Sequence, residues 1–159
     1  MDRPRTASHL LFSLLLTGLI WVANAGQERP ISARSAAIQL AVHEEVIAGG
    51  LSNREDLCLS VKGRNPSGDV VGRLREEGIL VHKPSWCAKG PRGVGIEVRS
   101  VALTHERRAQ VEVRTGDYNL AEGEDFGKLL RQGTYVLERD ATGTWRIVDY
   151  KKNCGPARD

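Results

Sequence analysis

Three arginines in the C-terminal half of the chain have the type and spacing to form a binding site. They stand in segments that alternate apolar and polar residues, with glutamates on the same or neighbouring segments. If two or more guanidinium groups converged on a concave surface, they would bind an anion, because these groups recognise carboxylates and phosphates through paired hydrogen bonds. On a flat solvated face they would instead pair with glutamates across strands. The arginines are Arg99, Arg114 and Arg146, and the glutamates are Glu97, Glu112 and Glu138.

The histidines do not form a pattern typical of catalysis or metal binding. His43 is followed by two glutamates, but neighbours on a helix point in different directions, and the residue four positions on is Ile47. His82 and His105 stand at segment ends, with no Ser or Cys nucleophile identifiable beside them. We expect no metal and no cofactor. An acid–base enzyme would need a titratable group buried at the base of a pocket, and the candidates are His82, His105, Asp117 and Asp149.

The three cysteines, Cys58, Cys87 and Cys154, have no C-x-x-C spacing, so we interpret them as structural thiols. We expect a disulfide between Cys58 and Cys87. Cys58 lies in the apolar segment 57–61, and Cys87 ends the segment that returns after the following helix. Pairing of Cys154 with either of the others is the alternative, and it would hold the C-terminal tail.

Residues 1–25 have the three-part pattern of a secretory signal peptide. Arg3 and Arg5 give a positive start, an apolar run spans Leu10–Val22, and Ala23–Ala25 supplies the small residues that a signal peptidase reads. The run is short for a bilayer span, and no second apolar stretch follows it. We expect cleavage after Ala25, export of residues 26–159 as a single domain to the periplasm or the exterior, and no membrane span in the mature chain.

The charge balance argues against nucleic acid as a partner. The chain has 23 Lys and Arg against 20 Asp and Glu, and beyond the leader the two signs alternate without forming runs. A nucleic-acid-binding surface needs a basic tract, and a membrane-surface helix needs a polybasic face. Neither is present in the sequence.

The hydrophobic period changes from helical to extended along the chain, which predicts an α+β fold. Ser32 or Ser35 can cap a helix reaching Ala48, and Asn65 before Pro66 can begin a second one that ends at Glu77. We expect these N-terminal helices to pack on one face of a curved antiparallel sheet of about four strands. Residues 87–93 and 118–128 are predicted loops; the extended segments are 57–61, 79–82, 94–103, 109–115, 134–139 and 144–150.

The C-terminal hairpin, with Tyr135–Arg139 before its turn and Gly143–Val148 after it, resembles the final strands of nuclear-transport-factor-2-like and other cystatin-like sheets. The middle segment, from Leu57-Cys58-Leu59 through Asn65-Pro66-Ser67 to Trp86-Cys87, resembles small exported bacterial proteins of unassigned function. The hairpin resemblance implies a cone-shaped fold with a helix on a curved sheet. It carries over no catalytic residue.

These observations predict an exported, non-enzymatic binding domain. Its partner would be an envelope or extracellular protein, or a small molecule, bound through the open sheet face or the adjoining loops. A small pocket enzyme with histidine or carboxylate acid–base chemistry is the alternative, and a structural role in the envelope is a third.

Overall fold

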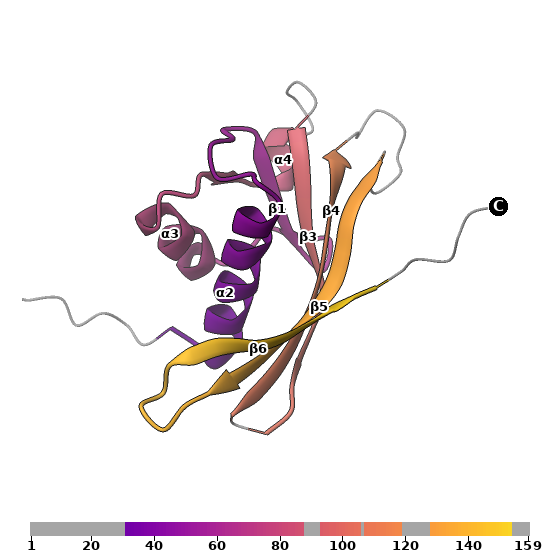
Figure 1. The fold of residues 1–159 in the computed structure, drawn as a ribbon. Helices are drawn as coiled ribbons and strands as arrows, with labels where there is room; N and C mark the ends of the chain where they lie inside the picture. The colour runs from indigo at the N-terminus through magenta and orange to yellow at the C-terminus, as the bar shows by residue number, and fades with distance from the viewer. Residues whose placement is uncertain (1–30, 88–92, 106, 119–127, 154–159) are drawn as a thin grey trace, which may run out of the picture. The chain divides into compact units, whose positions relative to one another are not determined.

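The computed structural model describes residues 31–87, 93–105, 107–118 and 128–153 (Figure 1). The predicted leader, the alternative disulfide partner Cys154 and most of the two predicted loops lie outside the described residues. Cleavage after Ala25 and export of the chain therefore stay predictions. Within the described ranges, no helix has the length and apolar character that crossing a membrane requires.

The helices precede the antiparallel strands in the chain, as predicted for an α+β fold. Figure 1 shows α2 and α3 on the same side of the sheet. The elements are α2 (Ala33–Ala48), β1 (Leu57–Val61), α3 (Gly68–Glu76), β2 (Val81–His82), α4 (Pro84–Cys87), β3 (Gly93–Leu103), β4 (Arg108–Tyr118), β5 (Leu129–Arg139) and β6 (Trp145–Lys152).

The sheet has six strands in the order β2-β1-β3-β4-β5-β6. The prediction of about four antiparallel strands is therefore wrong in strand number and in direction. β1 runs parallel to both β2 and β3, whereas β3 to β6 form an antiparallel meander. The reason lies in the connections. A helix between two strands returns the chain to the end where it started, so strands joined through α3 can pair in parallel.

The core lies between α2 and the face of the sheet that curls round it. α2 begins at an N-cap in which the Ser32 hydroxyl accepts a hydrogen bond from the Ser35 amide at 3.0 Å. The second helix begins later than predicted, at Gly68 with Ser67 as its N-cap, and Pro66 is buried just before it. The fully buried side chains include Ala37, Ala41, Val42 and Val46 from α2, Val70 and Leu74 from α3, and Ile96, Val98, Val111, Val113 and Leu137 from the sheet.

Three register shifts bend the long strands. At each shift one residue has no partner on the neighbouring strand: Arg99 in the β3–β4 ladder, Leu130 in the β4–β5 ladder and Val148 in the β5–β6 ladder. Such β-bulges increase the local twist and re-aim the neighbouring side chains. The bulges let one sheet contact α2 through β3, β4 and β6.

The predicted disulfide between Cys58 and Cys87 is confirmed. It joins β1 to α4, with the two Cα atoms 6.3 Å apart. Both residues are buried, with exposed fractions of 1% and 6%. The bond therefore fastens the parallel edge of the sheet, where β2 contributes only two residues.

Removal of this disulfide is expected to lower the free energy of unfolding by about 3.5 kcal/mol, because the bond closes a loop of about 30 residues in the unfolded chain. The variant is Cys58→Ala with Cys87→Ala, and the measurement is urea unfolding followed by circular dichroism. Cys154→Ala is the control, since it leaves the Cys58–Cys87 bond intact. Equal stability of the double variant and the control under oxidising conditions would contradict the prediction.

Candidate binding site

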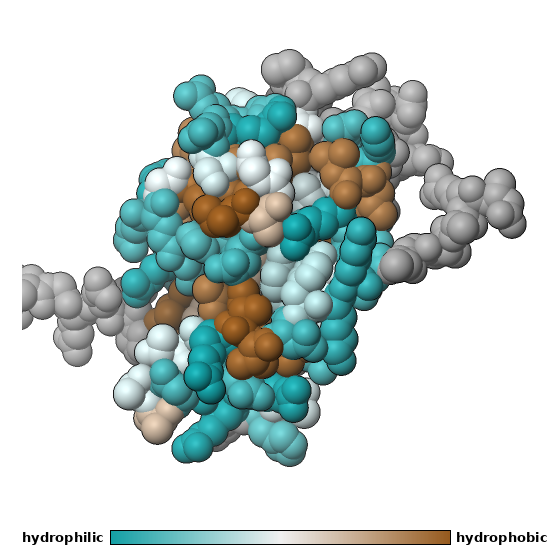
Figure 2. Space-filling model, viewed as in Figure 1, coloured by the Kyte–Doolittle hydropathy of each residue, from teal (hydrophilic) through white to brown (hydrophobic). Residues whose placement is uncertain are grey.

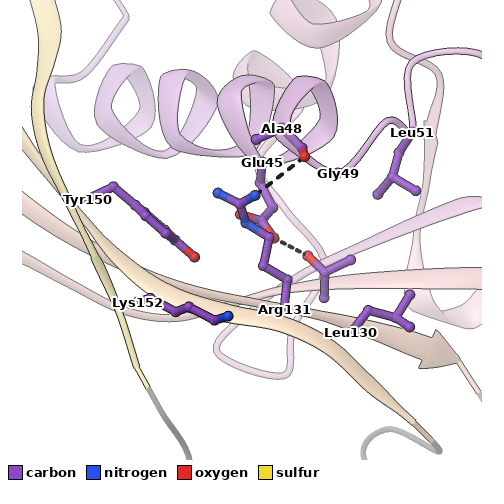
Figure 3. A pocket seen from close by; sticks show the side chains of 9 residues that line it. Glu45, Ala48, Gly49, Leu51, Leu130, Arg131, Tyr150 and Lys152 are labelled. Atoms are coloured by element: carbon purple, nitrogen blue, oxygen red, sulfur yellow. Dashed lines mark hydrogen bonds and ion pairs between the residues drawn. The ribbon is translucent and has the colours of Figure 1, made fainter.

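A hollow of about 370 Å³ opens between the C-terminal end of α2 and the curled end of the sheet (Figure 3). We call it the α2–β6 hollow. Four elements contribute to its wall, so none of them could form it alone. The lining residues are Glu45, Ala48, Gly49 and Leu51 from α2 and the turn after it, Thr115 from β4, Leu130 and Arg131 from β5, and Tyr150 and Lys152 from β6.

Glu45 is the polar centre of the hollow. It lies on the buried face of α2, one turn after Ala41, and its exposed fraction is 1%. The Thr115 hydroxyl donates a hydrogen bond to Oε1 at 2.8 Å, and the Tyr135 hydroxyl donates one to Oε2 at 2.6 Å. The Nε atom of Arg131 lies 3.1 Å from Oε2. A buried carboxylate needs such partners, because removing it from water is costly.

The register of the sheet brings these partners together. Thr115 lies directly across from Arg131 in the β4–β5 ladder, and Tyr135 lies across from Tyr150 in the β5–β6 ladder. Arg131 and Tyr135 are four residues apart on one strand, so both side chains point to the same face of the sheet. That face is the one that α2 covers, which places Glu45 among all of them.

Arg131 is held loosely for a buried ion pair. Its terminal nitrogens make only long contacts, from Nη1 to the Ala48 carbonyl at 3.4 Å and from Nη2 to the Tyr135 hydroxyl at 3.5 Å. The guanidinium carbon lies 4.7 Å from the centre of the Tyr150 ring. Burial by itself lowers the pKa of Arg131, but Glu45, Tyr135 and Tyr150 together outweigh it, so the pKa is raised above its ordinary value. The group therefore stays cationic, with donor capacity left for a further acceptor.

Tyr150 crosses the neighbouring strand at a glycine. A Cβ atom at Gly133 would overlap the Tyr150 ring, so only glycine lets the ring lie across β5 there. The Tyr150 hydroxyl points toward Arg131 (Figure 3) and is buried; it makes no well-aligned hydrogen bond to a described residue, but its interaction with the guanidinium helps to raise the pKa of Arg131. Lys152, two residues on, extends its amine into the same space. A phenol oxygen can accept from a neighbouring guanidinium and still donate its own proton, so the Tyr150 hydroxyl can bind an acceptor on a ligand.

The three predicted arginines do not line this hollow. Arg114 contacts Glu97 through Nε, and Arg99 lies 3.9 Å from Glu112; both are on the face of the sheet away from α2. Arg146 pairs in register with Glu138 on β6 and β5. This arrangement matches the cross-strand pairing alternative, and ligand binding by these arginines stays a prediction.

The histidines and aspartates named from the sequence also lie outside the hollow. His82 stacks on Trp86 with ring centres 3.7 Å apart, and its Nε2 lies 2.9 Å from the Glu55 carbonyl oxygen. His43 lies 3.8 Å from Glu44 on α2. Within the described ranges, no group of three or more potential metal ligands occurs. The exposed residues of this set are His105, Asp117 and Asp149.

Sequence reasoning missed Arg131, Tyr150 and Lys152 as site residues and considered Glu45 only as a neighbour of His43. One signal was available. Glu45 follows Ala41 and Val42 on an apolar helix face, and a carboxylate in that position indicates a buried partner. The sequence could not show which partner, because Arg131 stands in a strand far along the chain. No protein-family model, curated protein or solved structure matches this chain.

Glu45→Gln is expected to lower the free energy of unfolding by about 2 kcal/mol, since Arg131 would lose its counter-charge in a partly buried site. Glu44→Gln is the matched control. Its side chain is 45% exposed, and we expect a change within about 0.5 kcal/mol. Urea unfolding of both variants measures the difference, and equal free energies of unfolding would show that the Glu45 charge does not stabilise the fold.

The stability of the fold is expected to decline at alkaline pH through Tyr135. Burial, followed by the hydrogen bond to Glu45 and the charge of Glu45, raises the pKa of the Tyr135 phenol above its ordinary value of 10.0. The folded state keeps this proton where the unfolded chain releases it. The stabilisation is therefore complete below pH 10.0 and is lost progressively above it.

Unfolding free energies of the wild-type protein and Tyr135→Phe, measured across this range, test that dependence. We expect the difference between the two proteins to shrink as the pH rises. A constant difference at every pH would show that the phenol does not hold its proton more tightly in the folded state.

Proposed function

We propose that the chain is an exported, non-enzymatic binding domain, and that its ligand is a small molecule with an anionic group and an apolar part, held in the α2–β6 hollow. The observation that carries this proposal is the Arg131 guanidinium, whose terminal nitrogens make only long contacts, together with the buried Tyr150 hydroxyl, which makes no well-aligned hydrogen bond to a described residue. A carboxylate or phosphate oxygen at that point would accept from both groups.

The charge of the hollow supports an anionic ligand. Two cations, Arg131 and Lys152, line it together with one carboxylate, Glu45. Glu45 balances Arg131, so Lys152 gives the lining a positive excess. The long contacts at 3.4 and 3.5 Å leave the terminal nitrogens of Arg131 able to form shorter bonds to a ligand.

The opposite wall supports an apolar part of the ligand. Leu51 and Leu130 line that side of the hollow (Figure 3). Leu130 is the residue skipped by the β5 bulge and is 51% exposed, so its side chain is accessible to a ligand. Figure 2, viewed as Figure 1, shows apolar patches among polar side chains on the face that it draws. A volume of about 370 Å³ suits a small ligand.

The arrangement of Glu45 favours binding over acid–base catalysis. A general base needs a free oxygen directed at the substrate proton. Here Thr115 and Tyr135 already donate to the two carboxylate oxygens, and Arg131 lies against one of them. The carboxylate therefore serves to hold Arg131 and Tyr135 in place. A pocket enzyme remains the second candidate function.

Export is supported by the disulfide, because such bonds persist in oxidising compartments. An exported protein would bind its ligand outside the cytosol. A protein partner on the outer sheet face has less support, since Arg99 and Arg114 lie beside Glu112 and Glu97 on that face.

A fluorescent carboxylic acid, a medium-chain fatty acid with a dansyl label, is expected to bind the purified protein and to compete with unlabelled acids of similar length. Lys152→Gln should weaken binding about fivefold by removing one exposed charge. Tyr150→Phe should weaken it to a similar degree and change the stability of the fold little, because the ring stays against Arg131 and the hydroxyl makes no well-aligned hydrogen bond to a described residue.

Lys151→Gln is the matched control, since Lys151 is the exposed neighbour on β6 that does not line the hollow. Its affinity should equal that of the wild-type protein. Competition by the matching neutral alcohol as strong as by the acid would overturn the anionic part of the proposal. Chemical conversion of the acid during incubation would favour the enzyme instead.

A further inference from the structure

A second concave region lies at the other end of α2. It has a volume of about 490 Å³ and is bounded by the first turns of α2 and α3 and by the turn after β1. We call it the basic cleft. It shares no lining residue with the α2–β6 hollow. Its lining residues are Arg34, Ser35, Ile38, Val61, Lys62, Arg64, Asn65, Ser67 and Val70.

The charged side chains that line the cleft are all positive. Three of its lining residues are cations, Arg34, Lys62 and Arg64, and none of the residues that line it carries a carboxylate. All three cations are exposed, so they can turn toward a ligand. Ile38, Val61 and Val70 give the cleft an aliphatic wall, against which the stems of the basic side chains can pack.

A rigid turn holds two of the cations in position. The Val61 amide donates to the Arg64 carbonyl at 2.9 Å, and the Arg64 amide donates back to Val61 at 3.1 Å. The Lys62 amide donates to the Val98 carbonyl at 2.8 Å, which ties the turn to β3. Lys62 and Gly63 both have positive φ, at 53° and 70°. Asn-Gly is the usual pair in such a turn, so a lysine at the first position is conformationally costly.

The position of Arg34 is also unfavourable for the stability of the fold. It stands in the first turn of α2, which holds no acidic residue, where the helix dipole disfavours a positive charge. α3 begins at the same cleft, and the hydroxyl of its N-cap Ser67 makes no capping bond. Asp69 is the acidic residue of that turn, and it does not line the cleft. A bound anion would relieve this accumulation of positive charge.

We propose that the basic cleft binds a phosphate group, with Arg34, Lys62 and Arg64 as its ligands. The three side chains approach from two elements, α2 and the turn after β1, so they can surround a tetrahedral oxyanion. Lys62 acts as a point charge, and the guanidinium groups supply paired hydrogen bonds. Three cations and no carboxylate line the cleft, whereas Glu45 lines the α2–β6 hollow together with two cations, so the two sites differ in charge.

Titration of the isotope-labelled protein with inorganic phosphate, followed by amide chemical shifts, tests the proposal. We expect saturable shifts centred on residues 61–70 and larger than those that chloride produces at the same ionic strength. Lys62→Asn and Arg64→Gln should each weaken binding about fivefold. Asn suits the positive φ of position 62, so Lys62→Asn should fold at least as stably as the wild-type protein, and its weaker binding would not come from unfolding.

Arg75→Gln, in the last turn of α3, is the control with the same change in charge, and it should leave phosphate binding unchanged. A second arm uses vesicles of phosphatidylglycerol, because a lipid headgroup presents the same chemistry as free phosphate. Dependence on Lys62 and Arg64 in either arm supports the site and identifies the source of the phosphate. Shifts no larger than those with chloride, together with vesicle binding that the variants leave unchanged, would overturn it.

Discussion

The burial of the Glu45 carboxylate is the constraint on which the arrangement of this protein depends. A charged group on the apolar face of α2 can be buried only where donors meet it, and Thr115, Tyr135 and Arg131 supply them from two neighbouring strands. Because these contacts are directional, they fix where the end of α2 lies along the sheet. The apolar packing of the same helix could tolerate small shifts, whereas the hydrogen bonds cannot. The α2–β6 hollow is a consequence of that fixed position.

The curvature of the sheet explains how the last strand reaches the α2–β6 hollow. A flat sheet would meet one helix along a line, but the bulges at Arg99, Leu130 and Val148 bend β3, β5 and β6. The bent strands bring Tyr150 and Lys152 of the last strand to the same space as the end of α2. At the opposite end of this helix, the turn after β1 and the start of α3 enclose the basic cleft. The two concave regions lie at opposite ends of one helix and differ in the charges that line them.

The sequence predicted local features well where the signal was local. Ser32 caps α2 as its side chain and position indicate, and the hairpin of β5 and β6 follows from alternating residues around a turn. The disulfide between Cys58 and Cys87 agreed with the order of segments. The sheet was predicted too small because the pairing of β1 and β2 depends on short segments distant in the chain. Five residues such as Leu57–Val61 indicate an extended strand, but they do not reveal its neighbour or its direction.

The sequence by itself determined which side chains are apolar and with what period, and therefore the helices, the strands and the α+β class. It also set the inventory of charges and cysteines. The tertiary structure alone decided which of these charges meet. Periodicity fixes the direction of a side chain relative to its own strand or helix, whereas the neighbour it faces depends on register, bulges and strand order. For that reason Arg99 and Arg114 lie beside glutamates on the outer face, while Arg131 lies against Glu45.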